Sequence, residues 1–355
     1  MEDRPGSASI RLGRDGASAT GPSSDRESYG HSRSCSRVQT GVNSVAVWLA
    51  SRHFSSLSHR TSVGHEMQRI TRLLLARAFR YSLATSAKER GPQGGVKFMN
   101  LWQRLRVVHR AWRYRLRCEP QEIACVRAHL SAGDTAIDIG AHQGAFTYWM
   151  RKRVGPHGRV VAFEPQPEMA ALLQRTKQAF GTRNVTIVNA GLSAEPGELT
   201  MHRPENAPSA CATFQPNAWE GGESFTVPVE ALDLYCIHHD LRPINFIKCD
   251  VEGHELPVFR GAATILREDR PVLLFECEQR MHDDDTMQDV FDLLLDLGYE
   301  GAFFRNGQQW PLDEFRPEYQ KSGMARSEYA NNFVFLPRES RSARQRRGLN
   351  GVVRG

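Results

Sequence analysis

The sequence predicts an α/β fold, in which helices cover both faces of a mostly parallel sheet. From Cys118 onward, short runs rich in β-branched residues alternate with stretches of helical periodicity, which is the pattern of parallel strands connected by helices. The first of these runs ends in a glycine turn that leads directly into a helix, a junction typical of the carboxyl edge of such a sheet. Both observations favour a single α/β core.

Each expected element follows from this alternation. We expect strands over Thr135–Ile139, 159–164, 185–189, 244–249, 272–277, 301–305 and 332–336. We expect helices over Ala145–Val154, Pro167–Phe180, 256–267 and 286–297. Three aspartates, 283–285, precede the last helix; because acidic residues suit a helix N-terminus, we leave them out of the active site. A Pro-, Gly- and Asn-rich segment, 197–229, holds two short strands at 198–202 and 225–229, and we expect it to shape a substrate pocket.

Charge is distributed unevenly along the 355 residues, whose overall net charge is +6. Residues 1–117 carry 21 Lys/Arg against 7 Asp/Glu, and residues 338–355 carry 6 against 1. The middle, 118–337, carries 19 Lys/Arg against 32 Asp/Glu and is therefore acidic. A nucleic-acid binder needs positive charge on the surface that meets the phosphates, so we expect no nucleic-acid partner.

Composition divides the chain into four parts. We expect a disordered low-complexity leader over 1–66, basic amphipathic helices over 67–117, the α/β domain over 118–337 and a basic disordered tail over 338–355. Met67 and Met99 are alternative starts of translation. In the second part, a stripe at helical spacing either docks on the acidic core or makes peripheral contact with a membrane or another partner; it comprises Leu101, Leu105, Val108, Trp112 and Leu116.

Cysteine spacing and hydropathy bear on the compartment. The seven cysteines contain no Cys-x-x-Cys pair, so their spacing predicts neither a disulfide framework nor a zinc site. No apolar run reaches the length of a membrane-spanning helix, and no signal-peptide stretch begins the chain. We therefore expect a soluble, cytoplasmic protein.

The glycine turn is the first candidate binding motif. Asp138 and Gly140 end the first strand, and Gly144 precedes the helix, so a ligand can approach backbone N–H groups there. The later glycines of the dinucleotide fingerprint are missing, which makes an NAD(P)-dependent oxidoreductase the alternative interpretation. About twenty residues further on, Glu164 ends the second strand, where a carboxylate can accept hydrogen bonds from both ribose hydroxyls.

A cluster of ionisable residues, 248–255, follows the fourth strand. Alternation along an extended strand places Lys248, Asp250 and Glu252 on one side. Asp250 and His254 are the candidate general bases, because a hydroxyl is a poor nucleophile until its proton is removed. Lys248 either neutralises Asp250 or contacts the substrate, and Glu252 and Glu255 are candidates to position substrate hydroxyls. The carboxylates could alternatively hold Mg²⁺, although we predict no metal site.

These segments together resemble the FkbM family of methyltransferases, through DIGAHQGAFT at 138–147, FEPQP at 163–167 and IKCDVEGHE at 247–255. The resemblance extends over about 119–337 and includes 229–233, 260–262 and 271–276. It implies a class I methyltransferase, Rossmann-like fold with a seven-stranded, mostly parallel sheet and an antiparallel last strand. It also implies S-adenosyl-L-methionine as cofactor and O-methylation of a hydroxyl on a sugar, glycolipid or secondary metabolite.

By position, the resemblance assigns roles to individual residues. Gly140 and Gly144 would line the methionine part of the cofactor, Glu164 would bind its ribose, and Asp250 would face the methyl group. Asn189 and Ala190 would approach the adenine. The sequence departs from the family at His142, usually Asn, whose ring can still donate a hydrogen bond to the cofactor. It departs again at Cys249, usually aliphatic, which packs as a small apolar residue.

We therefore predict an S-adenosylmethionine-dependent O-methyltransferase that acts on a small-molecule or glycan hydroxyl. Asp138 and the glycine turn position the cofactor, and Asp250 with His254 assists deprotonation of the acceptor. A non-catalytic cofactor-binding scaffold is a further alternative. Alignment of nucleophile, methyl and sulfur would supply several kcal/mol, of the order found for oriented intramolecular reactions.

Overall fold

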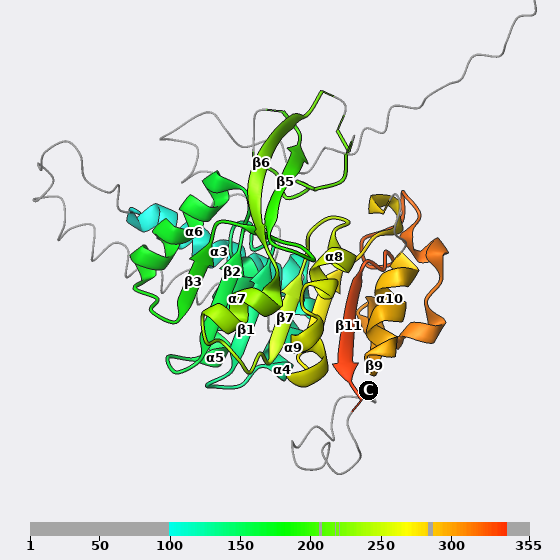
Figure 1. Ribbon diagram of the computed structural model, residues 1–355. Coiled ribbons are helices and arrows are strands. Elements are labelled where there is room, and N and C mark those ends of the chain that lie inside the picture. The colour runs from blue at the N-terminus through cyan, green and yellow to red at the C-terminus, as the bar shows by residue number, and fades with distance from the viewer. Residues whose placement is uncertain (1–98, 206–207, 217, 220, 283–286, 339–355) are drawn as a thin grey trace, which may run out of the picture. The chain divides into compact units, whose positions relative to one another are not determined.

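The computed structural model describes residues 99–338 apart from 206–207, 217, 220 and 283–286 (Figure 1). Its strands are β1 (Thr135–Ile139), β2 (Arg159–Phe163), β3 (Val185–Val188), β4 (Gly191–Leu192), β5 (Gly197–Arg203), β6 (Glu223–Glu230), β7 (Phe246–Cys249), β8 (Val272–Glu276), β9 (Tyr299–Arg305), β10 (Gln308–Pro311) and β11 (Asn332–Pro337). Its α-helices are α3 (Leu101–Arg113), α4 (Pro120–His129), α5 (Ala145–Val154), α6 (Pro167–Phe180), α7 (Leu232–His238), α8 (Glu255–Arg260), α9 (Ala263–Glu268) and α10 (Met287–Asp296).

One large sheet has the strand order β10-β9-β11-β8-β7-β1-β2-β3. Strands β3, β2, β1, β7 and β8 are parallel to one another, and β11 is antiparallel to both β8 and β9. The predicted class I methyltransferase fold, with its antiparallel last strand, is confirmed. The sheet differs by an eighth strand, because β9 and β10 form a hairpin through Asn306 and Gly307. The short, mostly polar β10 carries no hydrophobic alternation that would have predicted it.

Alternate residues of the central strands face two separate cores. Ile137 and Ile247 pack beneath α7–α10, whereas Ala136 and Phe246 pack beneath α3–α6. Strands buried on both faces form continuous apolar runs, which is why β1, β2, β7 and β8 were recognisable in the sequence. None of the helices within the described part of the chain is long and apolar enough to cross a bilayer.

The prediction of one helix over 256–267 is wrong in one respect, because this segment forms two short helices, α8 and α9. The break lies at Gly261, where a Cβ atom would stand 2.1 Å from the carbonyl oxygen of Ser193. The chain therefore turns where another backbone segment approaches too closely for a side chain. Asp233 stabilises the start of α9, since its carboxylate accepts hydrogen bonds from the backbone N–H groups of Thr264 and Ile265 at 2.7 and 2.9 Å.

The insertion between β3 and α7 forms a small second sheet in the order β4-β6-β5. Strands β5 and β6 are antiparallel, and together they extend beyond the carboxyl edge of the large sheet (Figure 1). The two strands predicted in this segment are confirmed, and they are longer than expected. The insertion therefore stands beside the edge at which the candidate site residues gather.

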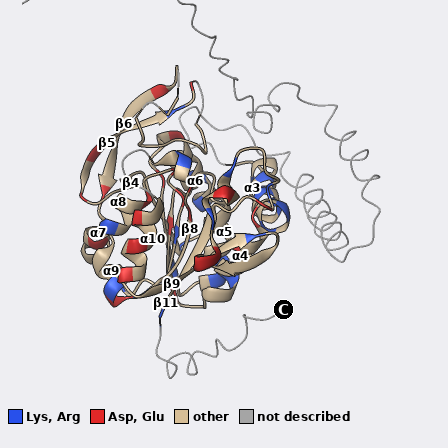
Figure 2. Cartoon of the chain, turned by 90° about the vertical axis from the view of Figure 1, so that its right-hand side faces the viewer, with Lys and Arg blue, Asp and Glu red and all other residues tan. Residues whose placement is uncertain are grey.

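The basic helix α3 docks on α5 and α6. Figure 2 marks basic residues (blue) on α3 and acidic residues (red) on α10. The indole N–H of Trp149 donates a 2.8 Å hydrogen bond to the carbonyl of Ala111. Val107 and Ala111 are buried, so the docked face is shifted from the predicted stripe, whose members are half-buried. The predicted leader 1–66, residues 67–98 of the predicted basic helices and the tail beyond 338 lie outside the described residues.

Candidate functional site

A pocket opens at the carboxyl edge of β1, β2 and β7. It holds about 840 Å³ of empty space, a volume that includes open solvent at its mouth. Its lining comes from five parts of the chain, namely 110–119, 139–146, 163–166, 190–214 and 248–251. The three predicted motifs therefore meet at one cavity, and residues upstream of the predicted domain join them.

Gly140 lets β1 and β7 approach each other closely at this edge. Its φ is +71°, and a Cβ atom there would lie only 1.9 Å from the carbonyl oxygen of Asp250. The N–H groups of Gly140 and Ala141 donate to the carbonyl of Phe163 at 3.1 and 3.0 Å, which ties the turn to β2. Only glycine allows this approach, because any side chain would collide with backbone.

Asp138 and Gly144 brace the turn without lining the pocket. Asp138 is 1% exposed and accepts a hydrogen bond from the hydroxyl of Thr147, on α5. Its other carboxylate oxygen has no hydrogen-bond partner, and burial raises the pKa of Asp138. Gly144 has a φ of +76°, and a Cβ atom there would lie 2.7 Å from Leu173 on α6. Both residues therefore set how the turn enters α5.

Glu164 lines the pocket at the end of β2. It is 2% exposed, and its carboxylate accepts from the N–H of His142 at 2.6 Å and from that of Gln166 at 2.9 Å. Burial raises the pKa of Glu164 to about 7, against the opposing effect of these hydrogen bonds. Asn189 does not line the pocket; its amide donates to the carbonyls of Glu164 and Pro165 at 2.9 and 3.0 Å and holds that segment in place.

His142 and Ala190 complete this side of the pocket lining. The ring of His142 is half-buried, and its Nε2 atom has no hydrogen-bond partner within the described structure. Burial lowers the pKa of His142 to about 4, so the imidazole is neutral near pH 7. The ring therefore presents an unused polar atom to whatever occupies the pocket.

Lys248 and Asp250 form an ion pair at the end of β7, with 3.0 Å between Nζ and Oδ2. Lys248 is 5% exposed. Burial lowers its pKa, but the carboxylates of Asp250 and Asp138 oppose this effect and leave the pKa raised. The ammonium group therefore remains charged and orients Asp250, whose side chain is 31% exposed. Both residues line the pocket.

Glu252 and His254 lie next to the pocket and outside its lining. Burial, together with the charges of Asp250 and Glu278, raises the pKa of Glu252 to about 8. His254 pairs with the hydroxyl of Ser193 at 3.0 Å, and its ring centroid lies 4.9 Å from that of Phe214. Burial lowers the pKa of His254 to about 4, so the ring is neutral near pH 7.

The pocket residues that the sequence analysis did not single out include Arg110 on α3, Tyr114 in the π-helical segment Tyr114–Cys118, and Glu119 after it. Burial raises the pKa of Glu119 to about 7, and the charge of Asp250 adds to the effect. Within the described part of the chain, the guanidinium group of Arg110 has no ion-pair or hydrogen-bond partner. Their only signal was helical periodicity, which indicates a buried face but cannot show that this face meets residues more than a hundred positions away.

Comparisons with known proteins agree with the fold and the motifs. Residues 138–300 match the model of the methyltransferase FkbM domain. "Methyltransferase 1" of Beauveria bassiana is 28% identical over 142 residues, 35% of this chain and 57% of that protein. "Hexuronic acid methyltransferase AglP" of Haloferax volcanii is 29% identical over 162 residues, 45% of this chain and 63% of that protein. The chain thus spans less than two thirds of either relative.

Among solved structures, a methyltransferase FkbM from Methylobacillus flagellatus matches 68% of this chain and 56% of its own, with 16% identity and a TM-score of 0.39. The resemblance to the FkbM family predicted from sequence is confirmed by the match of the domain model. The roles of the individual site residues stay predictions.

Substitution of Gly140 tests the close approach of β1 and β7. We expect Gly140→Ala to lower the free energy of unfolding by at least about 2 kcal/mol more than Gly307→Ala, because strain and overlap add at Gly140. Gly307 has a similar φ of +77° but no atom within 4 Å of its would-be Cβ, so it controls for backbone conformation alone. Urea unfolding measures both variants; equal losses would contradict the contact.

Proposed function

Because residues 138–300 form a methyltransferase FkbM domain, we propose that the chain transfers a methyl group from S-adenosyl-L-methionine to a hydroxyl group of a sugar, glycolipid or secondary metabolite. The observation that carries the proposal is the meeting of the glycine turn, Glu164 and Asp250 at one pocket. A candidate ribose-binding carboxylate and a candidate general base thereby lie on the walls of the same cavity.

The residues present fit this cofactor. The carboxylate of Glu164 can accept hydrogen bonds from both ribose hydroxyls, and the small side chain of Ala190 leaves room for a flat base. His142 Nε2 is a buried polar atom that lacks a partner, and burial without one is costly. Arg110 offers a cation to the carboxylate of the methionine part. The cofactor, when bound, supplies an electrophilic methyl group on a sulfonium.

Asp250 would take the proton from the acceptor hydroxyl. Its side chain is partly exposed within the pocket, and a carboxylate within hydrogen-bond reach can remove a proton as the nucleophile attacks. Lys248 would keep Asp250 oriented through their ion pair. Glu252 and His254 would act on the geometry of this segment, since neither lines the pocket; His254 would do so through Ser193.

The acceptor is proposed to be a sugar hydroxyl. One relative is named as a hexuronic acid methyltransferase, and strands β4 and β5, together with residues 209–214, contribute to the pocket lining. A glycan or small molecule entering there would reach the carboxyl edge of the large sheet. This assignment rests on the relative and on the open shape of the pocket together.

Equilibrium binding separates the proposal from an oxidoreductase. We expect the purified full-length chain to bind S-adenosylhomocysteine at least about tenfold more tightly than NAD, a difference in affinity of the size that one extra ionic contact gives. The reason is that the turn lacks the later glycines that let a pyrophosphate approach the backbone. Calorimetric titration of both ligands into the same preparation measures the difference. Tighter binding of NAD would overturn the proposal.

The ionisation of Glu164 should control cofactor affinity. Because burial raises its pKa to about 7, Glu164 is mostly protonated at pH 6 and mostly ionised at pH 8. Only the carboxylate accepts two hydroxyl hydrogen bonds, so S-adenosylhomocysteine affinity should rise about tenfold between these values, as linkage requires. Glu164→Gln should bind weakly at both pH values. Glu119 also titrates near pH 7, so Glu119→Gln is the matched control, and it should keep the rise.

Loss of the general base should slow transfer without weakening cofactor binding. We expect Asp250→Asn to lower the turnover number at least tenfold, since general-base effects are typically about 10²–10⁴, while S-adenosylhomocysteine affinity changes less than about twofold. Release of S-adenosylhomocysteine, with methyl glucuronoside and free sugars as acceptors, measures turnover. Asp313→Asn, at an exposed carboxylate, is the control. Unchanged turnover in Asp250→Asn would remove this residue from the mechanism.

A further inference from the structure

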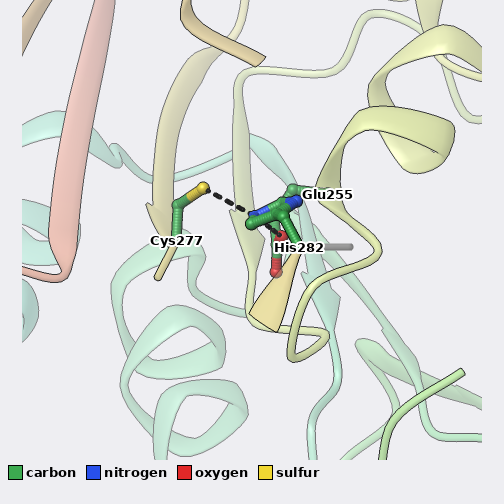
Figure 3. Close-up of side chains that lie close together, drawn as sticks. All are labelled: Glu255, Cys277 and His282. Carbon is green, nitrogen blue, oxygen red and sulfur yellow. Dashed lines mark hydrogen bonds and ion pairs between the residues drawn. The ribbon is translucent and has the colours of Figure 1, made fainter. Parts of the chain in front are cut away.

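A second group of chemically reactive side chains lies outside the pocket lining. Glu255 begins α8, Cys277 follows β8, and His282 follows the 3₁₀ turn Gln279–Met281. Figure 3 shows the three side chains converging, with the imidazole between the thiol and the carboxylate. Glu255 and Cys277 are each 1% exposed, and the side chain of His282 is also 1% exposed. The group is therefore fully enclosed by protein.

Hydrogen bonds alone do not satisfy all the polar atoms of this group. Nε2 of His282 lies 3.3 Å from Sγ of Cys277 and also 3.3 Å from Oε2 of Glu255. One nitrogen carries at most one proton, so it cannot donate well to both atoms. Oε1 of Glu255 accepts from the N–H of Gly253 at 3.1 Å, but Oε2 has no hydrogen bond. A buried carboxylate oxygen without a partner is costly, and here it points at the other two groups.

The three atoms have the spacing and chemistry of metal ligands. The thiol sulfur, imidazole nitrogen and carboxylate oxygen all lie within 4.8 Å of one another. Bonds of about 2.0 Å from zinc to nitrogen or oxygen, and about 2.3 Å to sulfur, place tetrahedral ligands roughly 3.3–3.6 Å apart. The two distances of 3.3 Å from Nε2 of His282 meet this requirement, and the sulfur and the carboxylate oxygen, within 4.8 Å of each other, would move closer together on binding an ion. A sulfur and a nitrogen ligand favour zinc and disfavour Mg²⁺, which prefers oxygen.

We propose that Glu255, Cys277 and His282 bind one Zn²⁺ ion. Binding displaces the thiol proton to solvent, and the thiolate and carboxylate then neutralise the two positive charges of the ion. Three protein ligands leave the fourth tetrahedral position to a water molecule. The ion satisfies Oε2 of Glu255 and removes the competition between sulfur and oxygen for one imidazole proton.

The zinc ion would fix the segment that carries Asp250. Residues 250–255 connect β7 to α8, and at Gly253 a Cβ atom would lie 2.1 Å from the carbonyl oxygen of Met281. The segment therefore already presses on the 3₁₀ turn that precedes His282. A zinc ion bound by Glu255, Cys277 and His282 would link the ends of β7 and β8, two neighbouring strands of the sheet. Its role is to position this segment, and it takes no part in methyl transfer.

Metal analysis of the full-length chain tests the proposal. We expect about one zinc per chain after purification without chelators and after removal of any histidine tag, as a site with three protein ligands retains its ion. Cobalt substitution should give a thiolate-to-cobalt charge-transfer band in the near ultraviolet and the visible bands of tetrahedral cobalt. A chain that holds no zinc as isolated, and shows no thiolate–cobalt band after addition of cobalt, would overturn the proposal.

Ligand variants identify the site. Cys277→Ser and His282→Gln should each lose most of the zinc and the thiolate–cobalt band. Cys236→Ser should keep both, because Cys236 is an equally buried thiol on α7 and belongs to no such group among the described residues. Zinc retained in folded Cys277→Ser would contradict the assignment. If a variant fails to fold, the cobalt spectrum of the unaltered chain still decides, and S-adenosylhomocysteine binding, measured in parallel, tests the proposed function separately.

Discussion

The close approach of β1 and β7 is the constraint on which the site depends. A Cβ atom at Gly140 would lie 1.9 Å from the carbonyl oxygen of Asp250. The turn after β1 can therefore pass the end of β7 only if residue 140 has no side chain. This turn brings the N–H of His142 to Glu164 at the end of β2. The same contact fixes the backbone of Asp250. One steric condition thereby places the candidate ribose ligand and the candidate base around a single cavity.

The arrangement of charged side chains is the second determinant of the structure at the carboxyl edge of the large sheet. Asp138 lies opposite Lys248 in the register of β1 and β7, and Lys248 pairs with Asp250 two residues further on. The ammonium group faces two carboxylates that would otherwise repel each other in a medium of low dielectric. Removing Lys248 would leave these two carboxylates next to each other without a compensating cation. Charge balance inside the sheet and the chemistry of the pocket therefore draw on the same side chains.

Sequence patterns predicted the sheet and its motifs because strands buried on both faces and glycine turns leave local signals. They did not separate residues that line the pocket from those that support it. Asp138 and Asn189 lie in the expected motifs yet hold the backbone of the turn and of Glu164. The break at Gly261 depends on the distant carbonyl of Ser193, and no local pattern encodes such a contact. The Glu255–Cys277–His282 group was not predicted from the sequence for the same reason, since three separate segments supply it.

The role of the helices before β1 follows from the geometry of a parallel sheet. Its carboxyl edge is open, so a ligand bound there needs a wall from outside the strands. Docking of α3, through Trp149 and Ala111, brings Arg110, Tyr114 and Glu119 to that edge. The matched domain begins at residue 138, whereas the pocket begins at residue 110. A basic segment that composition sets apart from the acidic core thus supplies Arg110, the only arginine among the described residues that line the pocket.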